Sequence, residues 1–292
     1  MSETEILVRA PATSANLGPG FDCAACALGL CNELEVGPGE GVRVAGEGAG
    51  ELPEGPDNLA LRAFALLAPV EGRRFTFTNR IPLARGLGSS AAAVALGLVA
   101  GARAAGRAAD AGELLALGLP LEGHADNLAA ALAGGVCLAW DGAGGVRLAR
   151  IADAPPLEPV AVVPAARVDT ASARAALPAE VAHEDAAFTA GRAALLGAGA
   201  SAGDAELFAA ALGDRLHEPY RAAGAPILAA VRTELPAGAR GATLSGSGPT
   251  VIVWAEPARA EDCAAELSVR FPSELVLRPG AAGGGAVQDS AA

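Results

Sequence analysis

A glycine- and serine-rich segment between a strand-like run and a helix-like run restricts the possible folds more than any other part of the sequence. This segment, residues 82–93, reads Pro-Leu-Ala-Arg-Gly-Leu-Gly-Ser-Ser-Ala-Ala-Ala. Before it, Phe75 and Phe77 alternate with threonines over 74–79, which is typical of a half-buried strand. After it, an Ala-rich run from about 90 to 105 predicts a long helix. The fold must therefore lead a strand into a helix through one tight loop.

The composition of this loop suits phosphate binding. Its glycines let the backbone turn so that several N–H groups point into one concavity, and the positive end of the helix dipole adds to that field. The hydroxyls of Ser89 and Ser90 can donate to phosphate oxygens or bind Mg²⁺. The alternative is a flexible loop with a serine helix cap, and this segment alone does not decide between the two.

The charged residues exclude several classes of function. The chain has 33 acidic and 21 basic residues, a formal net charge of −12, whereas general nucleic-acid and anionic-membrane binders need a basic surface. We therefore expect no nucleic-acid partner and no membrane partner. All 21 basic residues are arginines, so the chain contains no lysine. A Walker-A loop, a protein-kinase ATP site and a pyridoxal Schiff base each require a lysine, and all three are excluded.

The 292 residues suffice for two domains of ordinary size, but few large side chains are present to fill their cores. There are seven Phe, two Trp and one Tyr, so small residues must pack by close approach of backbones. Cys23 and Cys26 have the spacing of a redox motif, but no second such pair and no nearby histidine could complete a zinc site. We interpret the five cysteines as core residues of a cytoplasmic protein. The N-terminus has no signal-peptide character, and the apolar run 86–102 is better interpreted as a buried helix than as a membrane span.

Strand-like and helix-like runs occur in both halves of the chain, which predicts an α+β fold of two domains that share a cleft. A double proline at 155–156 marks the boundary, giving domains at 1–155 and 156–280, and a disordered tail at 281–292. In the first half, a strand at 6–10 precedes a loop at 11–20, and Asp57 is placed to cap a helix that ends near 67. Further helices are expected at 111–118, 124–133, 179–197, 204–213, 225–235 and 257–270, and further strands at 136–140, 146–151, 159–164, 240–244, 249–255 and 274–278.

A polar cluster at residues 122–127 interrupts a region rich in Ala and Leu. It contains Glu122, His124, Asp126 and Asn127. Glu122 offers the hard oxygen ligand that Mg²⁺ prefers. The alternative is a cap for the following helix, in which Asp126 occupies the first turn and is favoured by the helix dipole. The segment alone favours neither.

Two more segments combine glycines with polar residues. Residues 244–250, Leu-Ser-Gly-Ser-Gly-Pro-Thr, lie between two predicted strands and on their own indicate only a hairpin turn. Residues 16–22, Asn-Leu-Gly-Pro-Gly-Phe-Asp, place polar side chains on a loop that two glycines tighten.

Together these four segments resemble the signature motifs of the GHMP family of small-molecule kinases. The first family motif matches residues 9–22, the second 82–93 and the third 244–250. Within the family, the chain is similar to the homoserine kinase branch, on the segments 122–127, 170–178 and 217–221. The resemblance spans residues 6 to about 255 in the order that the family has.

The resemblance implies a fold and an ATP site. The N-terminal domain would resemble domain 2 of ribosomal protein S5, the C-terminal domain would be a ferredoxin-like α/β sandwich, and the active site would lie in the cleft between them. ATP and Mg²⁺ would be the cofactors, with Asn58 at the adenine and with Ser90 and Glu122 at the metal. The ATP phosphates would be wrapped by Pro82, Leu83, Ala84, Arg85, Gly86, Leu87, Gly88, Ser89, Ser90, Ala91 and Ala92.

The resemblance also implies L-homoserine as the acceptor and a homodimer as the assembly. The carboxylate of this zwitterion suits a pair of arginines, Arg174 and Arg221, each of which can bind it through two hydrogen bonds. Its ammonium suits the carboxylates of Asp22 and Asp126. Further polar contacts would come from Asn16, His124 and Thr170.

The implied reaction transfers the γ-phosphoryl group of ATP to the hydroxyl of homoserine and gives O-phospho-L-homoserine for threonine biosynthesis. A loose transition state for phosphoryl transfer requires mainly positioning and neutralisation of charge. The candidate catalytic residues are Glu122, Asp126 and Asn127. Asp126 can take the proton of the hydroxyl, or Asn127 can simply orient it, and the sequence does not decide.

Two segments depart from the family pattern and keep the choice of acceptor open. Residues 23–31 carry small apolar side chains where many relatives have larger ones, and residues 223–227 read Ala-Gly-Ala-Pro-Ile after the Tyr-Arg pair. The main alternative is therefore a GHMP kinase that acts on a different small-molecule alcohol. A nucleotide-binding pseudokinase is disfavoured, because Ser90, Glu122 and Asp126 are all retained.

Overall fold

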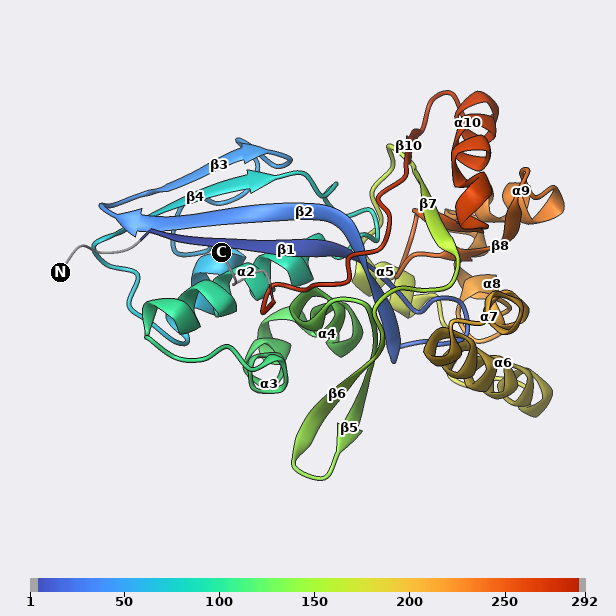
Figure 1. The fold of residues 1–292 in the computed structure, drawn as a ribbon, viewed down its shortest axis with the longest axis horizontal. Helices are drawn as coiled ribbons and strands as arrows, with labels where there is room; N and C mark the ends of the chain where they lie inside the picture. The colour runs from blue at the N-terminus through green and yellow to red at the C-terminus, as the bar shows by residue number, and fades with distance from the viewer. Residues whose placement is uncertain (1–4, 289–292) are drawn as a thin grey trace.

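Two β-sheets organise the chain into two lobes, and the computed structural model describes residues 5–288 (Figure 1). The strands are β1 (Ile6–Ala15), β2 (Ala24–Pro38), β3 (Val42–Gly46), β4 (Arg73–Asn79), β5 (Val136–Gly142), β6 (Gly145–Ala152), β7 (Glu158–Val163), β8 (Ala239–Leu244), β9 (Val251–Ala255) and β10 (Leu275–Leu277). The first sheet runs β3-β4-β2-β5-β6 with β1 also paired to β2, and the second runs β10-β7-β9-β8. The predicted α+β fold is confirmed, and the predicted boundary falls between β6 and β7.

Four helices form a layer on the first sheet, which is possible only because their side chains are small (Figure 1). They are α1 (Leu59–Ala65), α2 (Ser89–Ala104), α3 (Ala111–Glu122) and α4 (Ala125–Ala133). Helix α2 packs so closely on α1 that a Cβ atom on Gly97 would lie 2.0 Å from the carbonyl oxygen of Ala60. The backbones touch where glycine stands, as the shortage of large residues predicted.

The second sheet separates two groups of helices, because alternate residues of its strands face opposite sides. On one side, Val160 and Val162 of β7 pack with α9 (Pro226–Thr233) and α10 (Ala260–Arg270). On the other side, Ala161 and Val163 join the main core together with residues of α6 (His183–Ala202) and α7 (Ala205–Ala211). The remaining short helices are α5 (Thr170–Ala175), α8 (Glu218–Arg221), η1 (Ala222–Gly224) and η2 (Pro257–Arg259).

The first strand is longer than the sequence predicts. A strand at 6–10 and a loop at 11–20 were expected, but β1 continues to Ala15 and pairs antiparallel with β2 throughout. The register shifts between Pro11 and Ala12, and such an irregularity accommodates a residue that has no N–H to donate. Strand β2 itself was not expected, because its first half is a run of small apolar residues without alternation.

Asn58, rather than Asp57, caps the first helix. The side-chain oxygen of Asn58 accepts hydrogen bonds from the backbone N–H groups of Ala60 and Leu61, at 3.0 and 3.4 Å. Its amide group donates to the carbonyl oxygen of Pro53 at 2.9 Å. The predicted cap is therefore wrong by one residue, and the side chain of Asn58 is held in place from both ends.

The C-terminal segment is packed against the first lobe, and the predicted disorder from 281 onward is wrong for residues 281–288. Gly29 and Ala27 exchange backbone hydrogen bonds with this segment, and Ala286 is fully buried. The N–H groups of Ala286 and Val287 donate to carbonyl oxygens at the end of α4. Glycine-rich sequence is ordered here because backbone contacts replace the missing side chains; residues 289–292 lie outside the described part of the chain.

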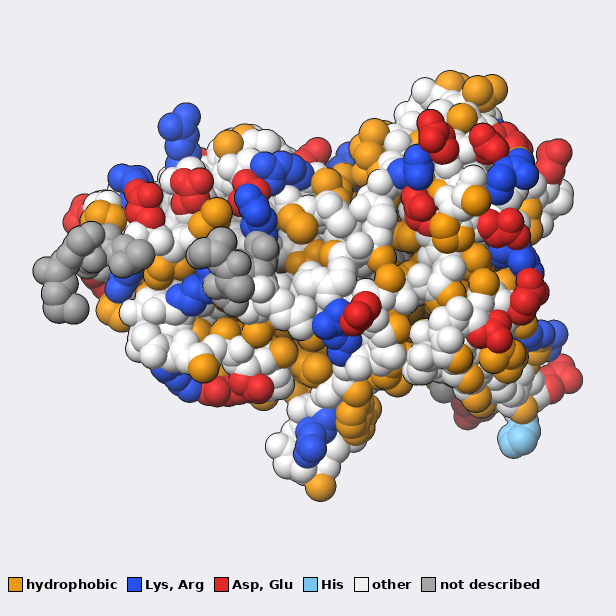
Figure 2. All heavy atoms as spheres, viewed as in Figure 1, with side chains coloured by type: hydrophobic (Ala, Val, Ile, Leu, Met, Phe, Trp, Pro, Cys, Tyr) orange, Lys and Arg blue, Asp and Glu red, His pale blue; other side chains and the backbone are white. Residues whose placement is uncertain are grey.

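The surface mixes charges of both signs. On the face shown in Figure 2, arginines lie among carboxylates over both lobes, and the hairpin of β5 and β6 projects from the body with basic and apolar side chains. Across residues 5–288, no helix combines the length and the apolar character needed to cross a bilayer.

Candidate active site

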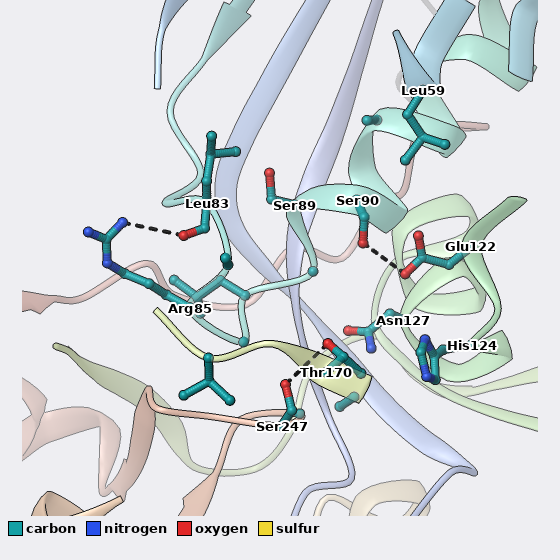
Figure 3. Close-up of a pocket in the computed structure, with 18 of the residues that line it drawn as sticks. Leu59, Leu83, Arg85, Ser89, Ser90, Glu122, His124, Asn127, Thr170 and Ser247 are labelled. Carbon is teal, nitrogen blue, oxygen red and sulfur yellow. Dashed lines mark hydrogen bonds between the residues drawn. The ribbon is translucent and has the colours of Figure 1, made fainter. Parts of the chain in front are cut away.

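A cavity of about 800 Å³ is lined by residues of both lobes, and most of the predicted site residues meet there (Figure 3). From the predicted set the lining contains Asn16, Asp22, Asn58, Leu83, Ala84, Arg85, Gly86, Leu87, Gly88, Ser89, Ser90, Glu122, His124, Asp126, Asn127, Thr170, Arg174 and Arg221. Pro82, Ala91 and Ala92 do not line it, and all three are buried. Residues that are far apart in the sequence therefore share one site.

The three glycine-rich segments are hydrogen-bonded to one another. Ser245 Oγ donates to the carbonyl oxygen of Gly86 at 2.6 Å and lies 3.0 Å from Ser14 Oγ. Asn16 Nδ2 donates to the carbonyl oxygen of Gly246 at 3.0 Å. Segment 244–250 is the turn between β8 and β9, as predicted, and it also holds the first two segments together.

The N-terminus of α2 is open toward the cavity. Gly88 is the N-cap residue, with φ of +66°, and no side chain among the described residues caps the helix there. The first N–H groups of a helix need acceptors, and the dipole makes this end positive, so an anion is favoured. A 16-residue helix is long enough to contribute its full dipole. Segment 82–90 therefore has a backbone geometry that suits a phosphate group, and we refer to it below as the phosphate loop.

Gly88 directly precedes α2 and Gly106 follows its other end, so alanine substitutions at the two glycines can be compared. A Cβ atom on Gly88 would lie 1.9 Å from Thr13 Oγ1, whereas Gly106, just past the other end, has φ of +67° and no atom within 4 Å. Gly88→Ala and Gly106→Ala therefore carry the same backbone strain, of roughly 1–2 kcal/mol, and only the first also collides with a neighbour. We expect Gly88→Ala to raise the KM for ATP about tenfold or more, and Gly106→Ala to leave it unchanged. Steady-state kinetics checks this, and equal KM values in the two variants would contradict it.

Glu122 and Ser90 face each other at the edge of this loop. Ser90 Oγ donates to Glu122 Oε1 at 3.0 Å (Figure 3), while the buried Oε2 atom of Glu122 has no hydrogen-bond partner among the described residues. Burial raises the pKa of Glu122 to about 7, against the smaller opposing effect of the Ser90 hydrogen bond. A buried carboxylate oxygen without a partner is costly unless a cation binds it. Hard oxygen donors at a phosphate loop fit Mg²⁺, with the phosphates as further ligands.

Asp126 and Asn127 lie in the first turn of α4, beside the same cavity. Asp126 Oδ1 accepts from the backbone N–H of Asn127 at 2.7 Å, and burial raises the pKa of Asp126 to about 6. Thr13 Oγ1 donates to Asn127 Oδ1 at 2.7 Å, which fixes the orientation of the amide. A carboxyl with a pKa near the working pH can exchange a proton with a substrate.

Asp22 and Arg174, which the resemblance assigns to the ammonium and to the carboxylate of the acceptor, form an ion pair with each other. Arg174 donates two hydrogen bonds to Asp22, at 2.8 and 2.9 Å, and both side chains are nearly half exposed. Arg221, in contrast, is 7% exposed and donates to the carbonyl oxygen of Gly246 at 3.2 Å. Of the two arginines, only Arg174 forms an ion pair within the described residues, so Arg221 keeps its charge for another partner.

The sequence did not indicate every residue at the cavity. Glu51 and Arg167, from different lobes, form an ion pair at its edge with an Oε2–Nη2 distance of 2.8 Å. Leu52, Pro53 and Phe77 supply apolar lining near Asn58, as a nucleobase requires. Arg85 extends away from Ser90 and Glu122 (Figure 3) and donates to the carbonyl oxygens of residues 164 and 165. The Glu51–Arg167 pair and the contacts of Arg85 join the two lobes, so no local sequence pattern distinguishes them.

Comparisons with known proteins agree with this geometry. The family model described as the GHMP kinases N terminal domain matches residues 58–135, and the GHMP kinases C terminal model matches residues 189–273. A homoserine kinase of Streptomyces avermitilis is 44% identical over 272 residues, which cover 89% of this chain and 88% of that protein. A homoserine kinase of Moorella thermoacetica is 41% identical, and the aligned region covers 85% of this chain and 86% of that protein.

Solved structures resemble the whole chain. The crystal structure of homoserine kinase from Cytophaga hutchinsonii superposes with a TM-score of 0.81 at 27% identity and covers 96% of both chains. A mevalonate kinase of L. major in complex with R-mevalonate has a TM-score of 0.73 at 16% identity, with 96% of this chain and 97% of that chain covered, so this likeness concerns the fold alone.

Proposed function

The chain belongs to the GHMP kinase family, and from this membership we propose that it transfers the γ-phosphoryl group of ATP to the hydroxyl of L-homoserine. The product is O-phospho-L-homoserine, the precursor used in threonine biosynthesis. One observation carries the choice of acceptor within the family: a buried guanidinium, that of Arg221, lies without an ion-pair partner among the described residues in the cavity that also contains the phosphate loop. A sugar has no carboxylate to bind there, whereas homoserine does. Mevalonate also carries a carboxylate, but it has no ammonium group for Asp22 to bind.

The residues around the cavity support an assignment of roles. The phosphates of ATP would bind at segment 83–90 and the N-terminus of α2, and the base in the apolar part near Asn58. Ser90 and Glu122 would hold Mg²⁺, which when bound neutralises charge on the phosphates. At the other end, the acceptor carboxylate would bind Arg174 and Arg221, and its ammonium would bind Asp22. Asn16, His124 and Thr170 complete the acceptor end.

Asp126 and Asn127 line the same cavity as the phosphate loop and Glu122, which supports a role for them in the transfer step. We propose that Asn127, held by Thr13, orients the hydroxyl and that Asp126 accepts its proton as the phosphoryl group is transferred. The pKa of Asp126, raised to about 6 by burial, leaves the carboxylate ionised at neutral pH. Most of the rate enhancement would come from positioning and from neutralisation of charge.

Binding of homoserine requires that the Asp22–Arg174 pair open. The acceptor is itself a zwitterion, so its carboxylate can replace Asp22 on Arg174 while its ammonium replaces Arg174 on Asp22. Each charged group exchanges one partner for another of the same sign, and no charge is left unpaired. The half-exposed pair costs little to separate.

The choice of acceptor is tested by a panel of alcohols in a coupled assay of ADP release. We expect kcat/KM for L-homoserine to exceed that for L-serine at least a hundredfold, because serine is one methylene shorter and a misplacement of about 1 Å can cost that factor. ADP release without acceptor is the control, and mass spectrometry identifies the product. Phosphorylation of mevalonate with homoserine inert would overturn the acceptor and leave the kinase class intact.

Two further features concern the compartment and the assembly. We propose a cytoplasmic protein, because Cys23, Cys26, Cys137 and Cys263 are thiols and a reducing compartment keeps thiols in that form. We also propose a homodimer, which rests on the family resemblance, and light scattering at micromolar concentration tests it.

A further inference from the structure

His217 is a fully buried titratable residue that does not line the cavity but lies directly behind Arg221. Its Nε2 atom is 2.8 Å from the carbonyl oxygen of Gly18, and its Nδ1 atom is 3.2 Å from Arg221 Nη1. A carbonyl oxygen can only accept a hydrogen bond, and a guanidinium can only donate one. Both contacts are satisfied by a single form of the ring: a neutral imidazole with its proton on Nε2 and its lone pair on Nδ1 directed at Arg221.

The imidazole ring is fixed by stacking as well as by hydrogen bonds. The ring of Phe21 lies parallel to it, with 4.9 Å between centroids and 18° between planes. The same phenyl ring has the guanidinium of Arg221 at 5.3 Å and that of Arg174 at 5.8 Å from its centroid. Phe21 and Gly18 both belong to the loop between β1 and β2, so this loop determines where His217 stands.

Within residues 5–288, every hydrogen-bond acceptor of Arg221 is neutral. Besides His217, its guanidinium donates to the carbonyl oxygens of Gly246 and Ala173, at 3.2 and 3.5 Å. A carboxylate in place of the imidazole would neutralise the guanidinium, and an apolar side chain would leave it free to turn. A neutral imidazole does neither: it orients the guanidinium and leaves its positive charge available to a ligand.

The surroundings keep the imidazole neutral. Burial lowers the pKa of His217, and the positive charge of Arg221 acts in the same direction, although Asp214 and the Gly18 carbonyl oppose them. Asp214 is the nearest carboxylate, with Oδ2 3.6 Å from Nε2. Its oxygens already accept three backbone hydrogen bonds, from Leu216, His217 and Glu218, at 3.0, 2.8 and 2.9 Å. The carboxylate is thereby satisfied without a charged imidazole.

We propose that His217 is a positioning residue for the acceptor: as the Nε2–H tautomer it links the Gly18 loop to Arg221 and holds that guanidinium in the orientation that binds the acceptor's carboxylate. This inference rests on the proposed function, since it assumes an acceptor that carries a carboxylate. His217 would thus affect the binding of the acceptor although it contacts neither ATP nor the acceptor.

Two amide variants each keep only one of the two hydrogen bonds that His217 makes, with Gly18 or with Arg221. In His217→Asn the amide oxygen can stand at the place of Nδ1 and accept from Arg221, but nothing reaches Gly18. In His217→Gln the amide nitrogen can stand at the place of Nε2 and donate to Gly18, but Arg221 loses its acceptor. We expect the KM for homoserine to rise roughly tenfold to a hundredfold in His217→Gln, as for a lost hydrogen bond to a charged group, and no more than about threefold in His217→Asn. The KM for ATP stays unchanged in both variants.

A substrate without the carboxylate charge distinguishes positioning from general damage. With L-homoserine amide as acceptor or competing ligand, wild type and His217→Gln should bind alike, because Arg221 then has no anion to hold. His183→Gln, an exposed histidine on α6, is the control for the substitution itself and should behave as wild type. An unchanged homoserine KM in His217→Gln, or an equal loss with the amide, overturns the proposal.

The protonation state can be measured without turnover. Nitrogen-15 NMR of imidazole-labelled protein at neutral pH should show His217 with a protonated Nε2 and an unprotonated Nδ1, and Arg221→Ala should shift the Nδ1 signal. A doubly protonated ring, or a proton on Nδ1, overturns the proposal even if homoserine is phosphorylated. If homoserine is not phosphorylated by wild type while the Nε2–H form is observed, the proposed acceptor is wrong rather than the link to Arg221.

Discussion

Replacing Glu122 by glutamine is expected to lower turnover at least a hundredfold while the melting temperature stays the same or rises. The substitution keeps the shape of the side chain and an acceptor for Ser90 Oγ, but it removes the negative charge next to the phosphate loop. Loss of one preorganised electrostatic contact typically costs about 10²–10³ in kcat. Stability should not suffer, because the buried Oε2 atom has no partner among the described residues and a neutral amide is cheaper to bury.

The pH dependence of stability gives a second measurement on the same variant. Burial holds the pKa of Glu122 at about 7 in the folded protein, above the value of about 4.3 for an unfolded chain. The contribution of this group to stability is then complete below pH 4.3 and is lost as the pH rises through 7. Without Mg²⁺, the melting temperature of Glu122→Gln should therefore exceed that of wild type more at pH 8 than at pH 5.

Glu113→Gln is the matched control, since Glu113 lies on the same helix but is about half exposed. It should change neither turnover nor the pH profile of melting. A large loss of stability in Glu122→Gln with near-normal turnover would show that the carboxylate is structural. Addition of Mg²⁺ together with nucleotide should also stabilise wild type more than Glu122→Gln.

Removal of the Arg221 side chain is the second substitution with a large expected effect. We expect Arg221→Ala to raise the KM for homoserine roughly tenfold to over a hundredfold and to leave ATP binding unchanged, because a charged hydrogen bond contributes about 1.5–3 kcal/mol. Arg174→Ala should have a smaller effect, because Arg174 is nearly half exposed and must give up its ion pair with Asp22 to bind the acceptor. In the double variant the effects should be less than additive, since both arginines would bind one carboxylate.

Initial rates over a matrix of ATP and homoserine concentrations measure these effects separately. Arg43→Ala, on the exposed side of β3, serves as the control for loss of an arginine and should match wild type. A homoserine KM that does not change in Arg221→Ala would remove Arg221 from the acceptor site.

The parts of the fold that depend on local sequence could be predicted. The order of strand, glycine-rich loop and helix around segment 82–90 is confirmed in β4 and α2, while phosphate binding by this loop stays a prediction. The α+β organisation followed from runs whose hydrophobic period is that of a strand or a helix. These features depend on residues within a few positions of one another.

Contacts between distant segments could not be predicted from the sequence. Nothing near Asp22 indicates that it pairs with Arg174, 152 residues away, and nothing near Glu51 indicates Arg167. Nothing near Arg85 indicates that its Nε and Nη2 atoms donate to carbonyl oxygens of residues 164 and 165 in the other lobe. The C-terminal segment was expected to be disordered because it lacks apolar anchors, yet its order depends on backbone partners in β2 and α4.

The packed C-terminal segment has a consequence for how the lobes can move. The chain crosses from the first lobe to the second between β6 and β7, and it crosses back after β10 to reach the first lobe again at Gly29 (Figure 1). The two lobes are therefore joined by two polypeptide connections in addition to the hydrophobic core that they share. Moving the second lobe away from the first would expose that core and would also have to detach residues 280–288 from β2 and α4.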